Sequence, residues 1–254
     1  MTQTTIGLSE AFANACPGLH EKWGAILVRT ANAAENDEEQ WTTALEKLRA
    51  YALSSLEETD LDPGDLALPE VTDPVALAGV GNGTLRTAFY KGIDLFLRRN
   101  RDPGDEEWPS DARKDAFIVV DGPSLASLVD GPAFDIARPP SLDEPWVVVV
   151  DSRDPTIVAY RGGGPYTGAV RVKARALGQF FDELANKSME RLCPIREYDG
   201  QIPLYDGSGQ RRLIDPPGGL EGRYRFPQGT PRGAQGAKAM LDDIERAGML
   251  WRDD

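Results

Sequence analysis

The chain has 254 residues, a length that suits one large domain, or one domain with a sizeable appendage, and that needs no disulfide or metal for stability. Its 41 acidic residues outnumber the 28 basic ones and give a formal net charge of −13. Because nucleic acids and anionic membranes are bound mainly through basic surfaces, the acidic excess argues against both partners.

The small number of cysteine and histidine residues limits the kinds of metal site and catalytic mechanism that the chain can have. Cys16 and Cys193 lie far apart and neither belongs to a CxxC pair, so we expect reduced thiols. The single histidine, His20, excludes zinc sites built from several imidazoles and leaves few routes to a Ser-His-Asp or Cys-His mechanism. The first 18 residues show no secretory pattern, and the longest apolar run, residues 146–150, is too short to span a bilayer. We therefore expect a cytoplasmic protein.

After a lead-in over residues 1–22, which could contain a short helix around residues 8–15, the predicted elements are a strand and two helices. Residues 23–30 are apolar without polar alternation, which is typical of a buried parallel strand, and they end in Arg29 and Thr30. A helix is predicted from residue 37, and its apolar stripe consists of Trp41, Leu45, Leu48, Ala52 and Leu56. Between residues 59 and 111 the chain is acidic and rich in turns, with one helix near residues 84–101.

Further strands follow. Residues 116–120 and 146–150 are buried-strand patterns that end at Asp121 and Asp151, and a short helix is predicted between them near residues 125–129. Residues 156–161 are predicted as another strand. Residues 169–173 alternate apolar and basic side chains, which favours a half-exposed antiparallel edge strand before a helix over residues 177–187.

These elements predict an α/β fold with a central, mostly parallel sheet flanked by helices, one antiparallel edge strand and an irregular C-terminal arm. We assign residues 1–189 to the core domain. Residues 190–254 contain repeated turns and form the predicted arm, which ends in an amphipathic helix over residues 234–250. This arm would wrap the domain or engage a partner.

Several short segments between residues 23 and 187 carry a resemblance to a known family. In chain order they are residues 26–30, the helix around Trp41, residues 117–121, residues 146–151, and the strand 171–173 leading to residues 180–184. Their order resembles that of a family of uncharacterised α/β proteins catalogued as a domain of unknown function. Relative to that family, residues 59–111 are an insertion. Because the family has no assigned activity, the resemblance implies the fold and no functional residue.

The ends of the predicted strands are the candidate functional site, because ligands of open α/β sheets bind beyond the carboxyl ends of the strands. The polar residues at these ends are Arg29, Thr30, Asp121, Ser124, Asp151, Ser152 and Arg153. If the strands ending at Asp121 and Asp151 are neighbours, the two carboxylates share one rim. They could then hold Mg²⁺ or divide acid and base roles.

Local structure offers another explanation for the same residues. Asp121 precedes Gly122-Pro123-Ser124 and could cap the next helix, and Asp151 and Asp154 are common turn residues. Arg29 could simply pair with one of these acids. The glycine-rich segment 161–168 lacks the consecutive Lys-Ser/Thr pair of a phosphate-binding loop and no helix start follows it directly, so no nucleotide fingerprint is present.

Two hypotheses for the function follow. The first is an accessory protein that binds a protein partner or a small polar ligand, with no nucleic acid and no membrane. The second is an enzyme acting on a small polar metabolite. In the enzyme, Asp121 and Asp151 would be metal ligands or the acid and base, Arg29 or Arg153 would bind an anion, and Tyr160 or Tyr166 would be a further donor.

Overall fold

The buried apolar strands of the sequence assemble into one central sheet. The computed structural model describes residues 3–19, 22–31, 37–100, 115–158, 166–194, 201–208 and 212–215. Seven strands lie in the order β4-β2-β5-β6-β7-β8-β9. Their bounds are β2 (Leu27–Arg29), β4 (Glu70–Val71), β5 (Ala116–Val120), β6 (Trp146–Asp151), β7 (Ala169–Lys173), β8 (Ile202–Tyr205) and β9 (Arg212–Ile214).

Strand direction is mostly shared, as predicted. Strands β4, β2 and β5 are parallel neighbours, and β7 and β8 are a second parallel pair. Strand β6 runs antiparallel to both β5 and β7, and β9 runs antiparallel to β8. The sheet therefore consists of two parallel blocks joined through one reversed strand.

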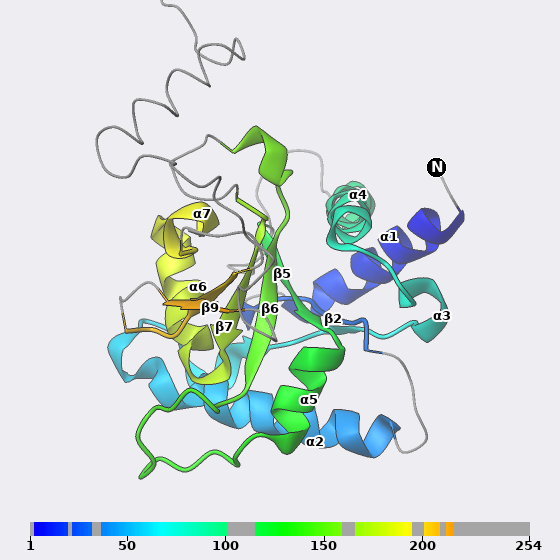
Figure 1. The fold of residues 1–254 in the computed structure, drawn as a ribbon. Helices are drawn as coiled ribbons and strands as arrows, with labels where there is room; N and C mark the ends of the chain where they lie inside the picture. The colour runs from blue at the N-terminus through cyan, green and yellow to red at the C-terminus, as the bar shows by residue number, and fades with distance from the viewer. Residues whose placement is uncertain are drawn as a thin grey trace, which may run out of the picture.

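Helices cover both faces of this sheet (Figure 1). One face is covered by α1 (Gln3–Ala15), α3 (Pro74–Leu77) and α4 (Asn82–Asn100). The other face is covered by α2 (Asp37–Ala52), α5 (Gly122–Asp130) and α6 (Leu177–Asn186). Short helical turns complete the chain as η1 (Cys16–Leu19), η2 (Leu53–Glu58), η3 (Pro63–Asp65), η4 (Pro155–Ile157), η5 (Ala174–Ala176) and α7 (Met189–Leu192).

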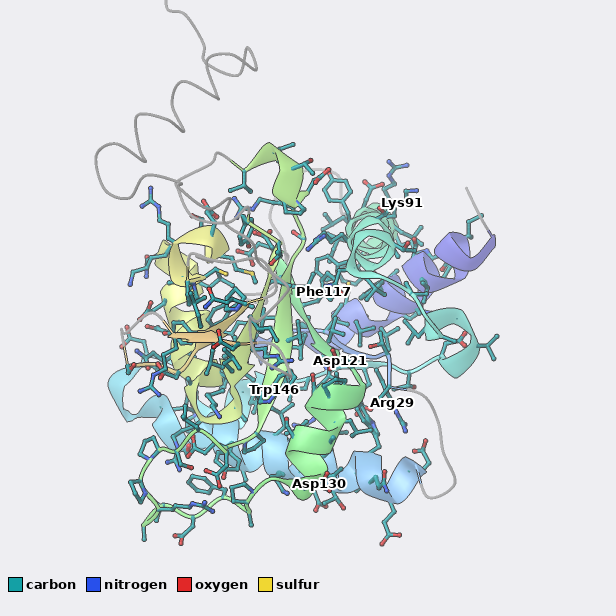
Figure 2. All side chains as sticks on the ribbon, viewed as in Figure 1. Arg29, Lys91, Phe117, Asp121, Asp130 and Trp146 are labelled. Atoms are coloured by element: carbon teal, nitrogen blue, oxygen red, sulfur yellow. The ribbon has the colours of Figure 1, made fainter. Side chains whose placement is uncertain are left out.

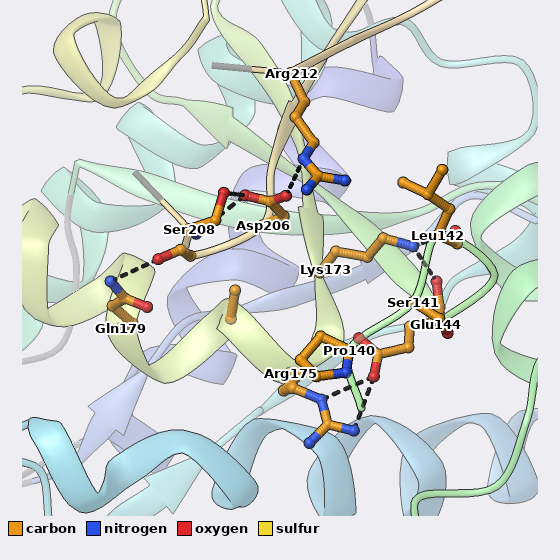
Figure 3. Close-up of a pocket in the computed structure, with 12 residues that line it drawn as sticks. Pro140, Ser141, Leu142, Glu144, Lys173, Arg175, Gln179, Asp206, Ser208 and Arg212 are labelled. Carbon is orange, nitrogen blue, oxygen red and sulfur yellow. Dashed lines mark hydrogen bonds and ion pairs between the residues drawn. The ribbon is translucent and has the colours of Figure 1, made fainter. Parts of the chain in front are cut away.

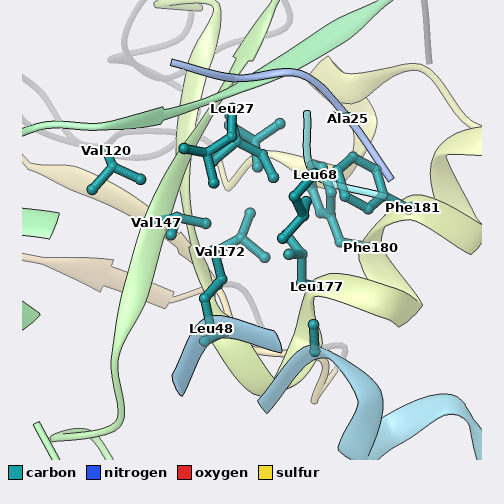
Figure 4. Close-up of a cluster of buried hydrophobic side chains, with 14 of the residues drawn as sticks. Ala25, Leu27, Leu48, Leu68, Val120, Val147, Val172, Leu177, Phe180 and Phe181 are labelled. Atoms are coloured by element: carbon teal, nitrogen blue, oxygen red, sulfur yellow. The ribbon is translucent and has the colours of Figure 1, made fainter. Parts of the chain in front are cut away.

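Two apolar cores result from the alternation of side chains along each strand. In β5, Phe117 and Val119 pack under α1 and α4, whereas Ile118 faces α2 and α5 on the opposite side. Figure 4 shows the core on the α2 and α6 face, where Leu48 and Phe180 meet the strands. The sheet is thus buried on both faces, which explains its continuous apolar strands.

Close packing of α1 against α4 forms the centre of the other core. The rings of Phe12, Phe89 and Phe117 contact one another, with the Phe12 and Phe89 centroids 5.4 Å apart in an edge-to-face arrangement. Gly92 permits this approach, because a Cβ atom there would lie 2.5 Å from the Cβ atom of Phe12. The lack of a side chain at Gly92 therefore sets the distance between the two helices.

The predicted strand over residues 23–30 is two strands. Its first part, β1 (Trp23–Gly24), leaves the central sheet and pairs in parallel with β3 (Leu66–Ala67). Gly24 has a φ of 127°, and a Cβ atom there would meet the carbonyl oxygen of Ala67 at 2.0 Å. The glycine thus breaks the strand before Leu27, where β2 begins. Residues 59–100 contribute β3, β4 and α3 besides the predicted helix, so this segment supplies an edge of the main sheet.

The position predicted for residues 169–173 is wrong in one respect. Strand β7 is antiparallel to β6, as expected, but it lies inside the sheet between β6 and β8. Its basic residues are accommodated locally, since the Arg171 guanidinium lies 3.7 Å from the centroid of the Trp146 ring and Lys173 donates to backbone carbonyls. The antiparallel edge strand of the sheet is β9.

Two other predictions change at the element level. The strand expected over residues 156–161 begins instead as the turn η4, because Asp154 accepts a hydrogen bond from the Thr156 N–H and Pro155 favours a helical start. The arm expected from residue 190 is not irregular throughout, since β8 and β9 extend the central sheet. The helix expected over residues 234–250 lies outside the described residues.

Candidate functional site

Asp121 and Asp151 lie at opposite ends of the sheet. Because β5 and β6 are antiparallel, Asp151 pairs with Ala116 at the start of β5, whereas Asp121 follows the last residue of β5. Five residues of extended chain separate these levels, a distance of about 17 Å. The shared rim on which both the Mg²⁺ site and the acid–base pair depended is therefore not formed. The error was the assumption that β6 is parallel to β5.

Asp121 is the N-cap of helix α5. Its carboxylate accepts hydrogen bonds from the backbone N–H of Ser124 at 2.9 Å and from the Ser124 hydroxyl at 2.5 Å. Ser124 itself is fully buried. The capping role foreseen for Asp121 explains both residues, and neither contact leaves the Asp121–Ser124 turn.

Arg29 and Thr30 lie at the same end of the sheet as Asp121 (Figure 2). The backbone N–H of Thr30 donates to the carbonyl of Val120 at 3.0 Å, which joins the ends of β2 and β5. The next strands of this sheet along the chain, β4 after β2 and β6 after β5, lie on opposite sides of the pair, but the helices that follow β2 and β5, α2 and α5, pack on the same face of the sheet. Arg29 is buried, lies 4.6 Å from the centroid of the Trp41 ring and donates to the exposed carboxylate of Glu38 at 3.2 Å.

Asp151 is the centre of a buried hydrogen-bond network at the other end. Its carboxylate is 1% exposed and accepts from the Arg153 backbone N–H, from two Arg153 guanidinium nitrogens and from the Tyr166 hydroxyl at 2.8 Å. Arg153 also donates to Glu190 at 2.6 Å. The neighbouring Ser152 donates its backbone N–H to the carbonyl of Asp115.

Charges in this network stabilise one another. Hydrogen bonding to Asp151 raises the pKa of Arg153 above its usual value. Burial, together with the charge of Asp151, raises the pKa of Tyr166, so the phenol stays protonated and donates to that carboxylate. Burial alone would raise the pKa of Glu190, but hydrogen bonds from Ser188 and Arg153 lower it to about 2. Donors and carboxylates thus satisfy one another internally, as in a structural network. Tyr160 lies outside the described residues.

A cavity of about 390 Å³ lies beyond the carboxyl ends of the parallel strands β7 and β8 (Figure 3). Since Lys173 pairs with Trp146 at the start of β6, the cavity lies at the end of the sheet to which Asp121 belongs. Four segments of the chain line it. They are the loop before β6 (Pro140, Ser141, Leu142, Glu144), the end of β7 with η5 and α6 (Lys173, Arg175, Ala176, Gln179), the turn after β8 (Asp206, Gly207, Ser208), and Arg212 of β9.

Lys173 is the most buried cation of this cavity, with 4% of its surface exposed. Its ammonium group donates to the carbonyl oxygens of Leu142 at 2.5 Å and Glu144 at 2.7 Å. Burial lowers the pKa of Lys173, and the nearby carboxylates of Glu144, Asp143 and Asp206 oppose that effect. Among the described residues, no carboxylate lies within ion-pair distance of this ammonium group.

The other charges of the cavity are paired. Arg175 donates from Nε to the buried carboxylate of Glu144 at 2.8 Å. Arg212 donates from Nε to Asp206 at 2.5 Å, and Figure 3 shows its terminal amino groups extending toward Lys173. Three cations and two carboxylates therefore line the cavity, which leaves one positive charge in excess.

None of these charged residues is among the strand-end residues predicted from the sequence. The only relevant pattern was the basic alternation of residues 169–173, which was attributed to solvent exposure of an edge strand. In the structure, that alternation places Lys173 at the end of an interior strand beneath the loop before β6. The contributions of Asp206 and Arg212 depend on β8 and β9, which the sequence did not predict.

A search of the described ranges found no group of three or more His, Cys, Asp or Glu residues that could hold a metal ion. Within the same ranges, no helix is both long and apolar enough to cross a membrane. Comparisons with protein-family models, with curated proteins and with solved structures found no match to the chain. The resemblance to a family of unknown function stays a prediction.

Proposed function

We propose that this protein is an accessory protein that binds a small polar ligand in the cavity beyond β7 and β8. One observation carries the proposal, namely a concave site of about 390 Å³ at the carboxyl ends of two parallel strands, lined by five charged side chains. Ligand pockets commonly measure ~300–1,000 Å³ and lie beyond the carboxyl ends of strands in α/β sheets. The cavity is at the small end of that range, which suits a metabolite.

The enzyme hypothesis is not carried forward. It needed Asp121 and Asp151 on one rim with Arg29 facing them, and the antiparallel pairing of β5 with β6 separates the two carboxylates. Asp121 is engaged in capping α5, and Asp151 is engaged by Arg153 and Tyr166. The lack of a nucleic-acid partner remains part of the proposal on the strength of the acidic composition. The cytoplasmic location remains part of it because neither cysteine belongs to a CxxC pair and reduced thiols are expected.

Ligand binding can be tested by obstructing the cavity. Ser208 is an exposed residue of its lining, and Ser208→Trp would place an indole at the opening. Thr43→Trp is the matched control, because it makes a similar change on the exposed side of α2. Thermal-shift measurements with sugars, amino acids, nucleotides and organic acids should find at least one ligand that stabilises the wild-type protein and Thr43→Trp.

The same ligand should fail to stabilise Ser208→Trp. If it shifts Ser208→Trp as strongly as the wild-type protein, the cavity is not the binding site. If no compound of any class shifts the wild-type protein, the protein is not a receptor for such ligands.

A further inference from the structure

We infer that the ligand of this cavity is a small organic anion, bound through a carboxylate or phosphate group by Lys173 and Arg212. This inference rests on the proposed function and assigns the chemical class of the ligand. Arg175 neutralises Glu144 and Arg212 neutralises Asp206, whereas the direct partners of Lys173 among the described residues are carbonyl oxygens alone.

An ammonium group carries three N–H donors. Lys173 donates two of its three N–H groups to the carbonyl oxygens of Leu142 and Glu144. With 4% of the residue exposed, water compensates little for the charge, and a buried charge is costly unless it is paired. An oxyanion in the cavity would accept the third hydrogen bond and neutralise the charge.

Arg212 of β9 adds a second donor group to the lining of the cavity. Its Nε atom is used by Asp206, and its terminal amino groups make no hydrogen bond to the rest of the described chain. Figure 3 shows these amino groups facing the Lys173 side chain. Planar guanidinium groups bind carboxylate and phosphate oxygens well, so one anion could accept from Arg212 and Lys173 together.

The remaining wall indicates an organic ligand. Pro140, Leu142 and Ala176 contribute apolar surface beside the charged groups. Such a surface would contact the short carbon skeleton of an organic anion. An inorganic ion has no apolar part that could make this contact. A cationic ligand is disfavoured because the lining already carries an excess positive charge.

The direct test is calorimetric titration of the full chain at low salt with succinate, with inorganic phosphate, and with succinamide as the neutral analogue of succinate. We expect at least one oxyanion to bind and succinamide not to bind, with affinity falling as salt concentration rises. Binding of succinate alone identifies a carboxylate ligand, and binding of phosphate alone identifies a phosphate group. Equal binding of succinate and succinamide, or no binding of either oxyanion, overturns the inference.

Substitutions locate the binding groups. Lys173→Met keeps the length of the side chain and removes the charge, so oxyanion affinity should fall roughly thirtyfold. Because Lys173 also holds the loop before β6, Arg212→Gln is the second variant, and it should weaken binding several-fold without disturbing that loop. Arg98→Gln is the control, since Arg98 is 76% exposed on α4 and should not affect binding.

The two proposals fail in different ways. One outcome would be that a neutral compound binds, that Ser208→Trp abolishes its binding, and that Arg212→Gln leaves its binding unchanged. In that case the cavity is a binding site but its ligand is not an anion. If Ser208→Trp leaves the binding of every compound unchanged, the cavity itself is excluded.

Discussion

Asp121 and Asp151 end similar apolar strands, yet they are used differently. Asp121 caps a helix that starts one residue later, and its contacts stay within the Asp121–Ser124 turn. Asp151 instead accepts from Arg153 and from Tyr166, which lies 15 residues further along the chain, and it is almost inaccessible to solvent. An ionised carboxylate in that environment depends on its donors, so we expect Asp151 to matter for stability.

We predict that Asp151→Asn lowers the free energy of unfolding by about 3 kcal/mol, because the neutral amide no longer matches the Arg153 guanidinium and one amide N–H faces donors. Urea denaturation followed by circular dichroism measures this loss. Asp94→Asn is the control, since Asp94 is half-exposed and, within the described part of the chain, forms an ion pair with Arg98 alone on the surface of α4. Its effect should stay below ~0.5 kcal/mol, and a similar loss in both variants would contradict the prediction.

Glu190 gives the same network a defined dependence on pH. Its pKa in the folded protein is about 2, against an ordinary value of 4.5. The ionised carboxylate therefore stabilises the fold above about pH 4.5, and this contribution disappears as the pH falls toward 2.

Glu190→Gln should remove this part of the pH dependence. We expect the wild-type protein to lose about 1–2 kcal/mol more stability than the variant between pH 6 and pH 2.5, allowing for solvent screening of the partly exposed Arg153. Urea midpoints of both proteins at the two pH values give the comparison. Parallel loss of stability in both proteins would show that Glu190 does not titrate as described.

At the scale of elements, sequence patterns identified most segments but not all of their directions. Residues 116–120 and 146–151 have the same apolar composition, and both are buried strands. A continuous apolar run indicates that a strand is buried on both faces, but it does not indicate whether the strand runs parallel or antiparallel to its neighbour. The prediction that Asp121 and Asp151 share one rim of the sheet depended on the relative direction of their two strands, and it was wrong because those strands are antiparallel.

The shortest strands could also not be predicted from the sequence. Strands β3, β4 and β9 have two, two and three residues, which is too few for a periodic pattern. They form because partners distant in the chain supply their hydrogen bonds, as Leu27 and Glu70 show in the pairing of β2 with β4. For the same reason, the cavity that depends on β8 and β9 could not be predicted.

The contact between α1 and α4 leads to a prediction about helix packing. A methyl group at Gly92 would meet the Phe12 Cβ atom at 2.5 Å and the Ser9 carbonyl oxygen at 2.8 Å. Gly92→Ala should therefore push the helices apart and lower the free energy of unfolding by about 1–3 kcal/mol.

The matched control is Gly83→Ala in the first turn of the same helix, where nothing lies within 4 Å of the added methyl group. Its stability should be unchanged or higher by up to ~1 kcal/mol, since alanine favours helix more than glycine does. Thermal and urea denaturation of both variants separates packing from helix propensity. Stabilisation by Gly92→Ala would show that the helices can move apart without loss.

At the scale of the whole molecule, the predicted division after residue 189 falls within one sheet. Tyr205 of β8 packs its ring 4.9 Å from the centroid of Phe180 on α6, and Leu204 is 1% exposed. Strand β8 thus shares a core with the segments before residue 190 through Tyr205, and β9 pairs with β8. The sheet needs residues up to Ile214 to reach its described width.

We therefore predict that a chain ending at residue 194 is less stable than a chain ending at residue 215, by ~4 kcal/mol, because the shorter chain loses the apolar burial of β8 and leaves β7 as an unprotected edge. Urea denaturation and near-ultraviolet circular dichroism compare the two chains. Equal stability would show that β8 and β9 are dispensable additions to the sheet.

The reach of the sheet into residues 201–215 has a consequence for protein synthesis. Lys173 and Arg175 leave the ribosome well before Asp206 and Arg212, so the cavity lacks one wall until β8 and β9 have emerged and paired. A ligand that binds in the cavity would act only after β8 and β9 have paired, and would slow their detachment from the sheet. Ligand binding in the cavity would then slow the amide hydrogen exchange of β8 and β9, although both strands lie far along the chain from Lys173.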